Sequence, residues 1–283
     1  MSGSERARVA SALARLCPQW DLADLGRIEY LEGGYSNDNF ALEHAGRRYV
    51  LRLPGLRQPY VDPEREAAWY GQLPRSVRVA RPIALDPGSG EMLSPWIEGT
   101  LLVDDWPGAV HGEPLPDLAR VAHLGAYLRQ LHADLPATTS AYPLRDLMRA
   151  YVPGEGIAAT LADVAPAHRQ TCHNDLNPWN IIVTDDGWVT LDWEMVGAND
   201  PLFDVVTIYE GLGLPRDGLL AFAMDVVGDV PVLEERVLQC LFAFWTREWG
   251  WAIFQRDRGN RRTEVLEQID TASARLAELG DRA

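Results

Sequence analysis

The sequence predicts an α+β fold with a small antiparallel β-rich lobe over residues 1–96 and a larger, mainly helical lobe over residues 97–283. Three observations support this prediction. Short strand-like runs separated by turn residues dominate the N-terminal part. Apolar residues recur at helical spacing after Gly99. The length of 283 residues exceeds that of a usual single domain, but it suits two lobes.

The first lobe reads as strands with one helix. Residues 27–53 contain β-branched and aromatic runs around a Gly-Gly turn, which predicts a hairpin. Asp62-Pro63-Glu64 has an N-cap residue followed by proline, and it predicts a helix through about Leu73. Two further strand-like runs, separated by the turn Asp86-Pro87-Gly88, cover residues 77–85 and 91–96.

The second lobe is predicted to be mainly helical. Apolar residues recur at helical spacing from Leu118 to Leu131. Two short strands at residues 180–184 and 188–191 flank the turn Asp185-Asp186-Gly187, which predicts a hairpin within this lobe. Helices are expected to resume at Pro201 and continue to the end.

The charge of the chain limits its partners. The formal net charge is −15, and all 26 basic residues are arginine because the chain contains no lysine. An anionic surface repels nucleic acid and anionic lipid, so neither is expected as a partner. Cationic small molecules suit such a surface better.

The cysteines and the N-terminus indicate a cytoplasmic protein. Cys17, Cys172 and Cys240 are few, widely spaced and odd in number, which argues against a disulfide framework or a zinc cluster. The N-terminal residues include several arginines and lack the apolar core of a secretory signal. No run of about 18 apolar residues is present, so no membrane segment is expected.

The strongest motif is His173-Asn174-Asp175-Leu176-Asn177-Pro178-Trp179-Asn180, followed after the hairpin by Leu191-Asp192-Trp193-Glu194. Phosphoryl transfer from a magnesium nucleotide needs a carboxylate to accept the hydroxyl proton and oxygen ligands for the metal. Asp175, Asn180 and Asp192 can supply both functions. The alternative interpretation is that His173 and Asp175 only stabilise a surface loop, since such segments are common in turns.

This pattern resembles the catalytic and metal-binding loops of the protein-kinase-like superfamily, in its aminoglycoside-phosphotransferase and choline-kinase branch. The resemblance implies a protein-kinase-like two-lobe fold. It implies that Asp175 is the catalytic base, that Asn180 and Asp192 bind Mg²⁺, and that His173 orders the loop through hydrogen bonds.

The resemblance extends upstream to a phosphate-binding loop and a cation. A Gly-Gly turn alone is weak evidence, but in this order the run of Gly33, Gly34, Ser36 and Asn37 is similar to the family's phosphate loop, where glycine lets N–H groups approach phosphates. The cation that grips the phosphates, lysine in protein kinases, must here be Arg52. Its helical partner is expected to be Glu66, with Glu64 as the alternative.

Three further segments are similar to family segments. Trp96 and Ile97 lie in the strand that links the lobes, where main-chain groups would hold adenine. His132 is expected to be a packed structural histidine. Asp204 ends a Gly-x-x-Asp-Pro-x-x-Asp segment, and by the resemblance it braces the catalytic loop.

The residues expected to contact the acceptor are less distinct. Similarity to bacterial choline and ethanolamine kinases favours an amino alcohol, and a quaternary ammonium is held by aromatic rings and carboxylates. The candidates, besides Asp175 itself, are Glu194, Tyr209, Glu210, Trp245 and Trp249. Trp245 and Trp249 are four residues apart, which fits an aromatic cage and equally a buried helix face.

The predicted function is ATP-dependent transfer of the γ-phosphoryl group to a hydroxyl of a cationic small molecule such as choline, with GTP as an alternative donor. An antibiotic O-phosphotransferase acting on an aminoglycoside or a peptide antibiotic is the main alternative. A second alternative is a catalytically weak nucleotide-binding scaffold. The sequence specifies neither the exact acceptor nor the oligomeric state.

Overall fold

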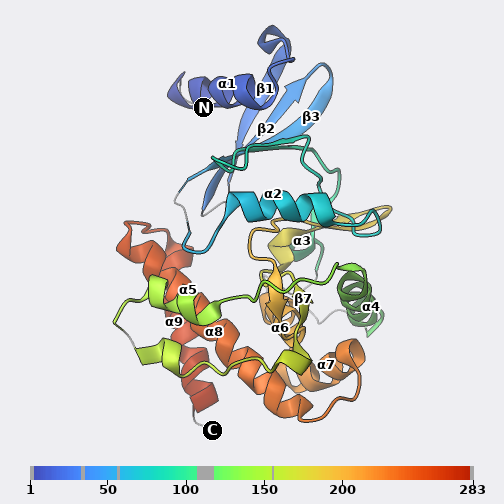
Figure 1. Ribbon diagram of the computed structural model, residues 1–283, viewed down its shortest axis with the longest axis vertical. Coiled ribbons are helices and arrows are strands. Elements are labelled where there is room, and N and C mark those ends of the chain that lie inside the picture. Colours follow the sequence, from blue (N-terminus) through green and yellow to red (C-terminus); the bar gives the residue numbers. More distant parts are fainter. Residues whose placement is uncertain (1–2, 33–35, 56–57, 107–117, 155, 281–283) are drawn as a thin grey trace. The chain divides into compact units, whose positions relative to one another are not determined.

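The computed structural model describes residues 3–32, 36–55, 58–106, 118–154 and 156–280 (Figure 1). The chain forms two compact units: Met1–Thr100 with Ile181–Glu194, and Leu101–Asn180 with Met195–Ala283. This division differs from the expected one at residues 96 and 97. The segment 181–194, expected in the helical lobe, belongs to the first unit because Val79 forms a β-bridge with Thr190, whose N–H donates to the Arg78 carbonyl at 2.9 Å.

A five-stranded antiparallel sheet, in the order β1-β2-β3-β5-β4, is the centre of the first unit. Its strands are β1 (Leu25–Leu31), β2 (Asn37–His44), β3 (Arg47–Pro54), β4 (Ala84–Leu85) and β5 (Met92–Pro95). The tight turn between β2 and β3 has positive φ at Ala45 (48°) and Gly46 (74°). Such a turn matches the twist of the two strands and fixes their register, in which His44 faces Arg47.

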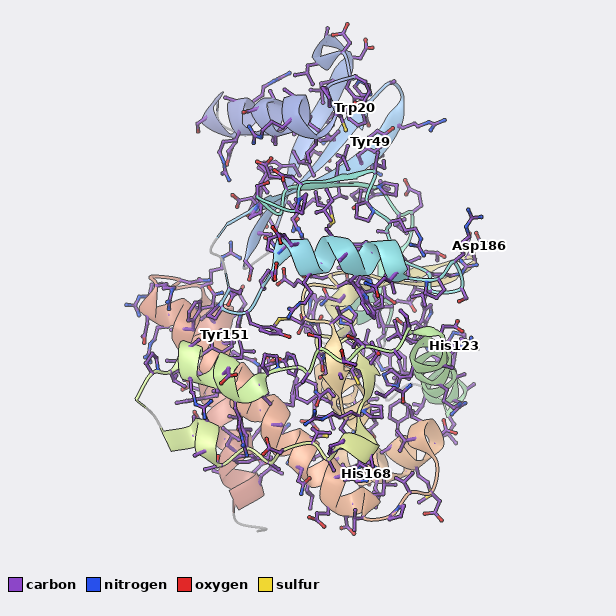
Figure 2. All side chains as sticks on the ribbon, viewed as in Figure 1. Trp20, Tyr49, His123, Tyr151, His168 and Asp186 are labelled. Atoms are coloured by element: carbon purple, nitrogen blue, oxygen red, sulfur yellow. The ribbon has the colours of Figure 1, made fainter. Side chains whose placement is uncertain are left out.

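One face of this sheet is covered by α1 (Gly3–Leu16). Val9 and Leu13 of the helix are buried in one cluster with Phe40, Leu51 and Leu93 of the sheet. A second contact packs a ring against the sheet near the turn between β2 and β3 (Figure 2). The Trp20 ring stacks on the His44 ring, with centroids 4.0 Å apart, and its centroid lies 4.9 Å from that of the Tyr49 ring. This packing supports β3, which is the central strand of the sheet.

The segment before β5 differs from its prediction. Residues 77–85 were expected to form one strand, but only Ala84–Leu85 does. The Val77 N–H donates to the Pro74 carbonyl in a turn, and the Arg81 N–H donates to the Val79 carbonyl. Local turns therefore take up the backbone groups that a longer strand would pair.

The predicted hairpin after the motif is present, with strands β8 (Ile181–Thr184) and β9 (Gly187–Thr190). Gly187 has a φ of +122°, a conformation that side chains rarely adopt, and it allows the sharp return. Asp192 follows two residues after β9. The strand β6 (Thr100–Leu101) lies at the division between the units.

The second unit is mainly helical, as Figure 1 shows. Its α-helices are α3 (Leu102–Asp105), α4 (Leu118–Asp134), α5 (Leu144–Tyr151), α6 (Leu202–Gly211), α7 (Leu219–Val227), α8 (Leu233–Asp257) and α9 (Thr263–Gly280). Short 3₁₀ turns are η2 (Gly156–Ala159), η3 (Pro166–His168), η4 (Pro178–Asn180) and η5 (Arg216–Gly218), with η1 (Leu22–Asp24) in the first unit. Strands β7 (Gln170–Cys172) and β10 (Gly197–Asn199) pair antiparallel.

The core of the second unit forms around α6 and α8. Every residue from Leu202 to Tyr209 is buried, and α8 packs along both α6 and α9. The α+β prediction, with an antiparallel β-rich first part and a mainly helical second part, is confirmed. Within the described residues, no helix is both long and apolar enough to cross a membrane.

Candidate active site

The cation on β3 is buried and forms an ion pair inside the first unit. Arg52 is 7% exposed and Glu66 is 1% exposed. The two Arg52 Nη atoms donate to the two Glu66 carboxylate oxygens at 2.9 and 2.5 Å. A buried charge needs such a partner, and the planar guanidinium matches a carboxylate with two parallel bonds.

The start of α2 (Pro63–Gln72) explains why Glu66 is the partner. Asp62 caps the helix by accepting from the N–H groups of Glu64 and Arg65 at 3.0 and 3.3 Å, and Pro63 occupies the first turn. This cap turns Glu66 inward, whereas Glu64 is exposed. The pairing expected for Glu66 rather than for Glu64 is therefore present.

Two more carboxylates approach the same guanidinium. Arg52 Nη1 lies 3.7 Å from Asp192 Oδ1 and 3.9 Å from Glu194 Oε2. The Glu194 backbone is fixed from α2, because Arg65 donates to its carbonyl at 3.2 Å. Burial alone lowers the pKa of Arg52, but attraction to these carboxylates, above all Glu66, raises it above its ordinary value.

This cluster fits a divalent cation. Three carboxylates surround one guanidinium, which leaves an excess of negative charge. The Asp192 side chain is 33% exposed although its Oδ1 is buried, whereas Glu66 is buried against Arg52. Carboxylate oxygen is the ligand that Mg²⁺ prefers.

A cavity of about 50 Å³ lies beside Arg52 in this unit, and Ser36, Asn37, Glu66 and Glu194 contribute to its wall. The Ser36 hydroxyl oxygen accepts from Gln58 Nε2 at 3.0 Å, and its carbonyl accepts from the Gly55 N–H at 3.0 Å. The structure thus brings the described half of the predicted phosphate loop to the Arg52 side chain. Gly33 and Gly34 lie outside the described residues.

Trp96 and Ile97 follow β5 and are half-buried. The Trp96 N–H donates to the Arg48 carbonyl at 3.1 Å, and the Arg48 guanidinium carbon lies 3.8 Å from the centroid of the Trp96 ring. These contacts fix the segment expected to face adenine; that role remains a prediction.

The motif loop of the second unit runs from the end of β7 to η4. His173 and Asn174 are fully buried, whereas the Asp175 side chain is 30% exposed. Asn180 Nδ2 donates to Asp175 Oδ2 at 3.1 Å and to the Asp175 carbonyl at 2.9 Å. Asp175 and Asn180 are therefore in direct contact, and the Asp175 carboxylate keeps access to solvent.

The carboxylate of Asp204, on α6, binds the backbone of this loop. Asp204 is fully buried and accepts from the N–H groups of His173 and Asn174 at 2.9 and 2.8 Å. Burial raises the pKa of Asp204, but hydrogen bonding and attraction from His132, with His173, lower it more, so the net pKa is below its ordinary value. The bracing contact expected for Asp204 is present.

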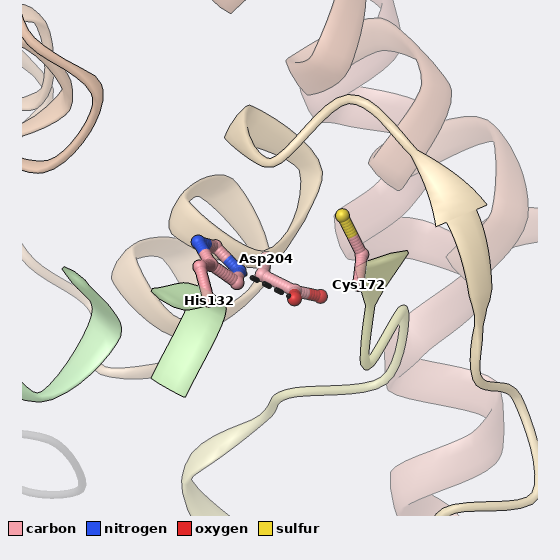
Figure 3. A group of neighbouring side chains, drawn as sticks. All are labelled: His132, Cys172 and Asp204. Carbon is pink, nitrogen blue, oxygen red and sulfur yellow. Dashed lines mark hydrogen bonds and ion pairs between the residues drawn. The ribbon is translucent and has the colours of Figure 1, made fainter. Parts of the chain in front are cut away.

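His132 completes the brace. Its Nε2 lies 2.9 Å from Asp204 Oδ2, and the ring is 6% exposed, as expected for a packed histidine (Figure 3). Cys172 lies close enough for the three side chains to resemble a metal site. However, Asp204 already accepts three hydrogen bonds, and burial followed by the charge of Asp204 raises the pKa of the Cys172 thiol. The hydrogen bonds of Asp204 to His132 and to the loop backbone give this cluster a structural role.

Asn174 adjusts the backbone of the loop. It has a φ of +65°, and its Nδ2 donates toward the carbonyls of Cys172, Met195 and Gly197 at 3.1 to 3.2 Å. Its Oδ1 accepts from Asn199 at 2.8 Å. This network satisfies a buried amide and fixes the turn that presents Asp175.

Arg247 is the residue that sequence reasoning missed. It lies on α8 and is 4% exposed, and its Nη2 is 3.3 Å from Asp175 Oδ1. Its Nη1 also donates to the Asn174 carbonyl, and its Nη2 pairs with Glu248 at 2.8 Å. Burial alone lowers the pKa of Arg247, but the nearby acids and Tyr142 raise it above its ordinary value. No sequence signal linked α8 to a loop about 70 residues earlier.

The predicted acceptor residues belong to both units. Glu194 lies in the first unit beside Arg52, whereas the other candidates lie in the second unit. Tyr209 is 4% exposed and its hydroxyl donates to the Pro215 carbonyl at 2.7 Å. Trp245 is 6% exposed and donates to Glu210 at 3.0 Å.

Of the two interpretations of the aromatic stretch, a buried helix face applies to Trp245. Its ring is packed at the edge of the Phe244 ring, with centroids 4.9 Å apart. Glu210 also lies 3.5 Å from Arg216 Nε, so its charge is already paired. Trp249 is half-buried, and among the described candidates on α8 it has the more accessible ring.

Comparison with known proteins gives a consistent result. The model of the phosphotransferase enzyme family APH matches residues 27–225. Protein LicA of Haemophilus influenzae is 27% identical over 198 residues, which are 65% of this chain and 58% of that protein. The match thus spans less than two thirds of that relative. The family match ends before α8, so Arg247 lies beyond it.

Solved structures share the fold. A choline/ethanolamine kinase family protein from Mesorhizobium loti superposes with a TM-score of 0.70 at 19% identity, covering 97% of this chain and 94% of that one. LicA in complex with AMP gives a TM-score of 0.70 at 16% identity, covering 99% and 100%. The kinase-like fold expected from the motifs is confirmed.

Proposed function

Because the chain belongs to the phosphotransferase enzyme family APH, we propose that it transfers the γ-phosphoryl group of a magnesium nucleotide to the hydroxyl of a small molecule. The observation that most directly supports this is the setting of Asp175. Its carboxylate is partly exposed on a loop whose neighbours, His173 and Asn174, are fully buried and braced by Asp204. A general base needs this combination of access and fixed position.

In the proposed reaction, the acceptor oxygen attacks the γ-phosphorus, the bond from that phosphorus to the bridging oxygen breaks, and the nucleoside diphosphate leaves. Asp175 accepts the hydroxyl proton. Asn180 holds the Asp175 carboxylate through its Nδ2, and Arg247 holds the other oxygen. Each oxygen of the carboxylate therefore has a fixed donor, which limits its rotation.

In the first unit, Arg52 supplies the cation that grips the nucleotide phosphates, and Ser36 and Asn37 belong to the loop that approaches them. Asp192 and Asn180 each offer an oxygen ligand to magnesium. When bound, the metal offsets charge on the β- and γ-phosphates. ATP is the proposed donor, with GTP as the alternative, and the relative bound to AMP supports an adenine nucleotide.

For the acceptor we propose an amino alcohol such as choline or ethanolamine. Support comes from the name of the Mesorhizobium loti relative and from the net charge of −15, which favours a cationic substrate. The buried positions of Tyr209 and Trp245 remove two rings from a prospective cage, so Trp249 is the accessible ring of this set, and the Asp175 side chain is 30% exposed.

An ADP-release assay tests the proposal. Magnesium ATP is combined with choline, ethanolamine, an aminoglycoside, a peptide antibiotic, thiamine and simple sugars, each in turn. Turnover with an amino alcohol that Asp175→Asn lowers roughly 10²- to 10⁴-fold supports the assignment. Turnover with an antibiotic alone would reassign the acceptor. Nucleotide binding without turnover on any acceptor would favour the scaffold alternative.

A further inference from the structure

The helical unit contains a second hollow, of about 420 Å³, whose lining does not include Asp175 or Asn180. Its walls come from α4, from the segment around η3 and β7, from the end of α7 and the residues that follow it, from Pro201, and from Arg236 of α8. Figure 2 labels His168, one of its lining residues. Among its lining residues, His132 also contacts Asp204 beneath the motif loop, and the others are not part of the candidate active site.

The lining of this hollow is cationic. Its basic and titratable members are Arg129, His132, His168, Arg169 and Arg236. Among the described residues, no aspartate or glutamate lines it. This is unexpected in a chain with 41 acidic and 26 basic residues. Asp225 and Asp200 offset the charges of Arg129 and Arg236, so Arg169 supplies the positive charge that favours an anion in this hollow.

The arginines are anchored but keep unused donors. Arg129 Nη1 binds the Asp225 carboxylate at 2.5 Å, and Arg236 Nε and Nη2 bind Asp200 at 2.9 and 2.8 Å. Arg169 Nε donates to the Val164 carbonyl at 3.0 Å. Within the described part of the chain, Arg129 Nη2, Arg236 Nη1 and both Arg169 Nη atoms have no acceptor.

None of these unused donors is buried and unsatisfied, so all of them reach solvent. Arg169 differs from the other two arginines because no described carboxylate pairs with it. Its full charge is therefore open to an incoming ligand. Arg129 and Arg236 are fixed in place by their aspartates, which reduces the entropy lost when a ligand is bound.

The hollow is larger than a single phosphate requires. Its volume falls within the range of small-molecule sites, roughly 300 to 1,000 Å³. Val226, Val227, Val230 and Pro231 form an apolar part of the wall. Planar guanidinium groups bind phosphate with paired hydrogen bonds, and an apolar wall suits a short carbon skeleton.

We propose that this hollow is a binding site for a small phosphate ester, with its phosphoryl group held by Arg129, Arg169 and Arg236. The ester's carbon skeleton lies against the valines. None of the residues that line the hollow is among the proposed nucleotide-binding residues. The inference does not depend on the proposed phosphotransferase activity.

Isothermal titration calorimetry of the whole protein at low ionic strength tests this inference. Glycerol 3-phosphate serves as the ester and inorganic phosphate as the free anion. We expect the ester to bind more tightly than phosphate, and Arg169→Gln to weaken ester binding about tenfold or more, because it removes hydrogen bonds to a charged group. Equal binding of the ester and phosphate would overturn the proposed role of the apolar wall.

Arg149→Gln is the matched control. Arg149 is an exposed arginine of α5 in the same unit, and its ion pair within the described residues is with Asp146 at 2.6 Å, so this variant should bind the ester as the wild type does. Arg129→Gln provides a second test if Arg169→Gln does not fold. No ester binding by the wild type, or equal affinities in the wild type and in both hollow variants, would overturn the proposal.

Discussion

Arg247 and Asp175 form an ion pair inside the helical unit, with Arg247 Nη2 3.3 Å from Asp175 Oδ1. The arginine is held in turn by Glu248 on the same helix, and Gln268 of α9 donates to Glu248 at 3.0 Å. Helices beyond the family match thus reach the proposed base through one side chain. Arg247 is a positioning residue, because it acts through Asp175.

Replacement of Arg247 should disturb the position of Asp175 without changing nucleotide binding. We expect Arg247→Met to lower kcat roughly 10²-fold, the loss associated with a misplaced reacting group, while the KM for ATP stays unchanged. Arg247→Lys should recover part of kcat because it retains the charge. Steady-state kinetics at varied ATP measures both, with Arg149→Met as the control.

Arg247→Met should also lower the free energy of unfolding by about 3 to 5 kcal/mol, since it leaves Glu248 without its buried partner. Urea denaturation of the wild type and the variant measures this loss. A variant that is folded and keeps the wild-type kcat would contradict the positioning role.

The Arg52 and Glu66 pair should show the opposite kinetic pattern. A lysine cannot form the two parallel bonds that Arg52 makes with Glu66, so Arg52→Lys should raise the KM for ATP more than it changes kcat. The cost should be about 1.5 to 3 kcal/mol, the usual worth of a hydrogen bond to a charged group. ATP titration measures it. If Arg149→Lys, a change at an exposed arginine of α5, had the same effect, it would show that the change is not specific to this pair.

Asp204 makes the stability of the helical unit dependent on pH. Its pKa is below the ordinary value, so its ionised form contributes stability at neutral pH, and this contribution is lost as the pH falls through the lowered pKa, below about 4. We expect Asp204→Asn to be about 1 to 3 kcal/mol less stable at pH 7. Urea denaturation at pH 7, 5 and 3.5 should show this difference shrinking with acid. A constant difference would contradict the assignment.

Gly211 lies so close to the motif loop that there is no room for a side chain at this position. A Cβ at this position would lie 2.6 Å from Cδ of Pro178, a rigid ring between Asp175 and Asn180. Gly211→Ala should therefore destabilise the protein by roughly 1 to 3 kcal/mol and lower kcat. Thermal unfolding and turnover measure the two effects.

Gly71→Ala is the matched control for Gly211→Ala. Gly71 lies in α2, and a Cβ there meets no neighbour within 4 Å, so the change should leave turnover intact and stabilise the helix by roughly 0.5 to 1 kcal/mol. Equal loss of activity in both variants would show that steric pressure on Pro178 is not the cause.

Local sequence signals predicted the parts of the fold that depend on residues adjacent in the sequence. The Asp62 cap and Pro63 fixed the start of α2, and the turn Asp185-Asp186-Gly187 fixed the β8 and β9 hairpin. The prediction of a single strand over residues 77–85 was wrong, because β-propensity does not show whether a partner strand is available.

Long-range contacts were beyond local signals. Arg247 meets the motif loop only after α8 packs in the folded unit, and no pattern near it indicates that partner. Helical spacing also could not separate a ligand cage from a core face for Trp245, because both require the same periodicity.

The discontinuity of the first unit bears on how the chain folds as it is synthesised. Residues 1–100 reach the ribosome exit first, but the hairpin that belongs with them, 181–194, follows only after 101–180 have been made. At about 5 to 20 residues per second, the earlier segment waits several seconds for its last two strands. Its central sheet must persist without them, and β2 and β3, joined by a tight turn, are the natural nucleus.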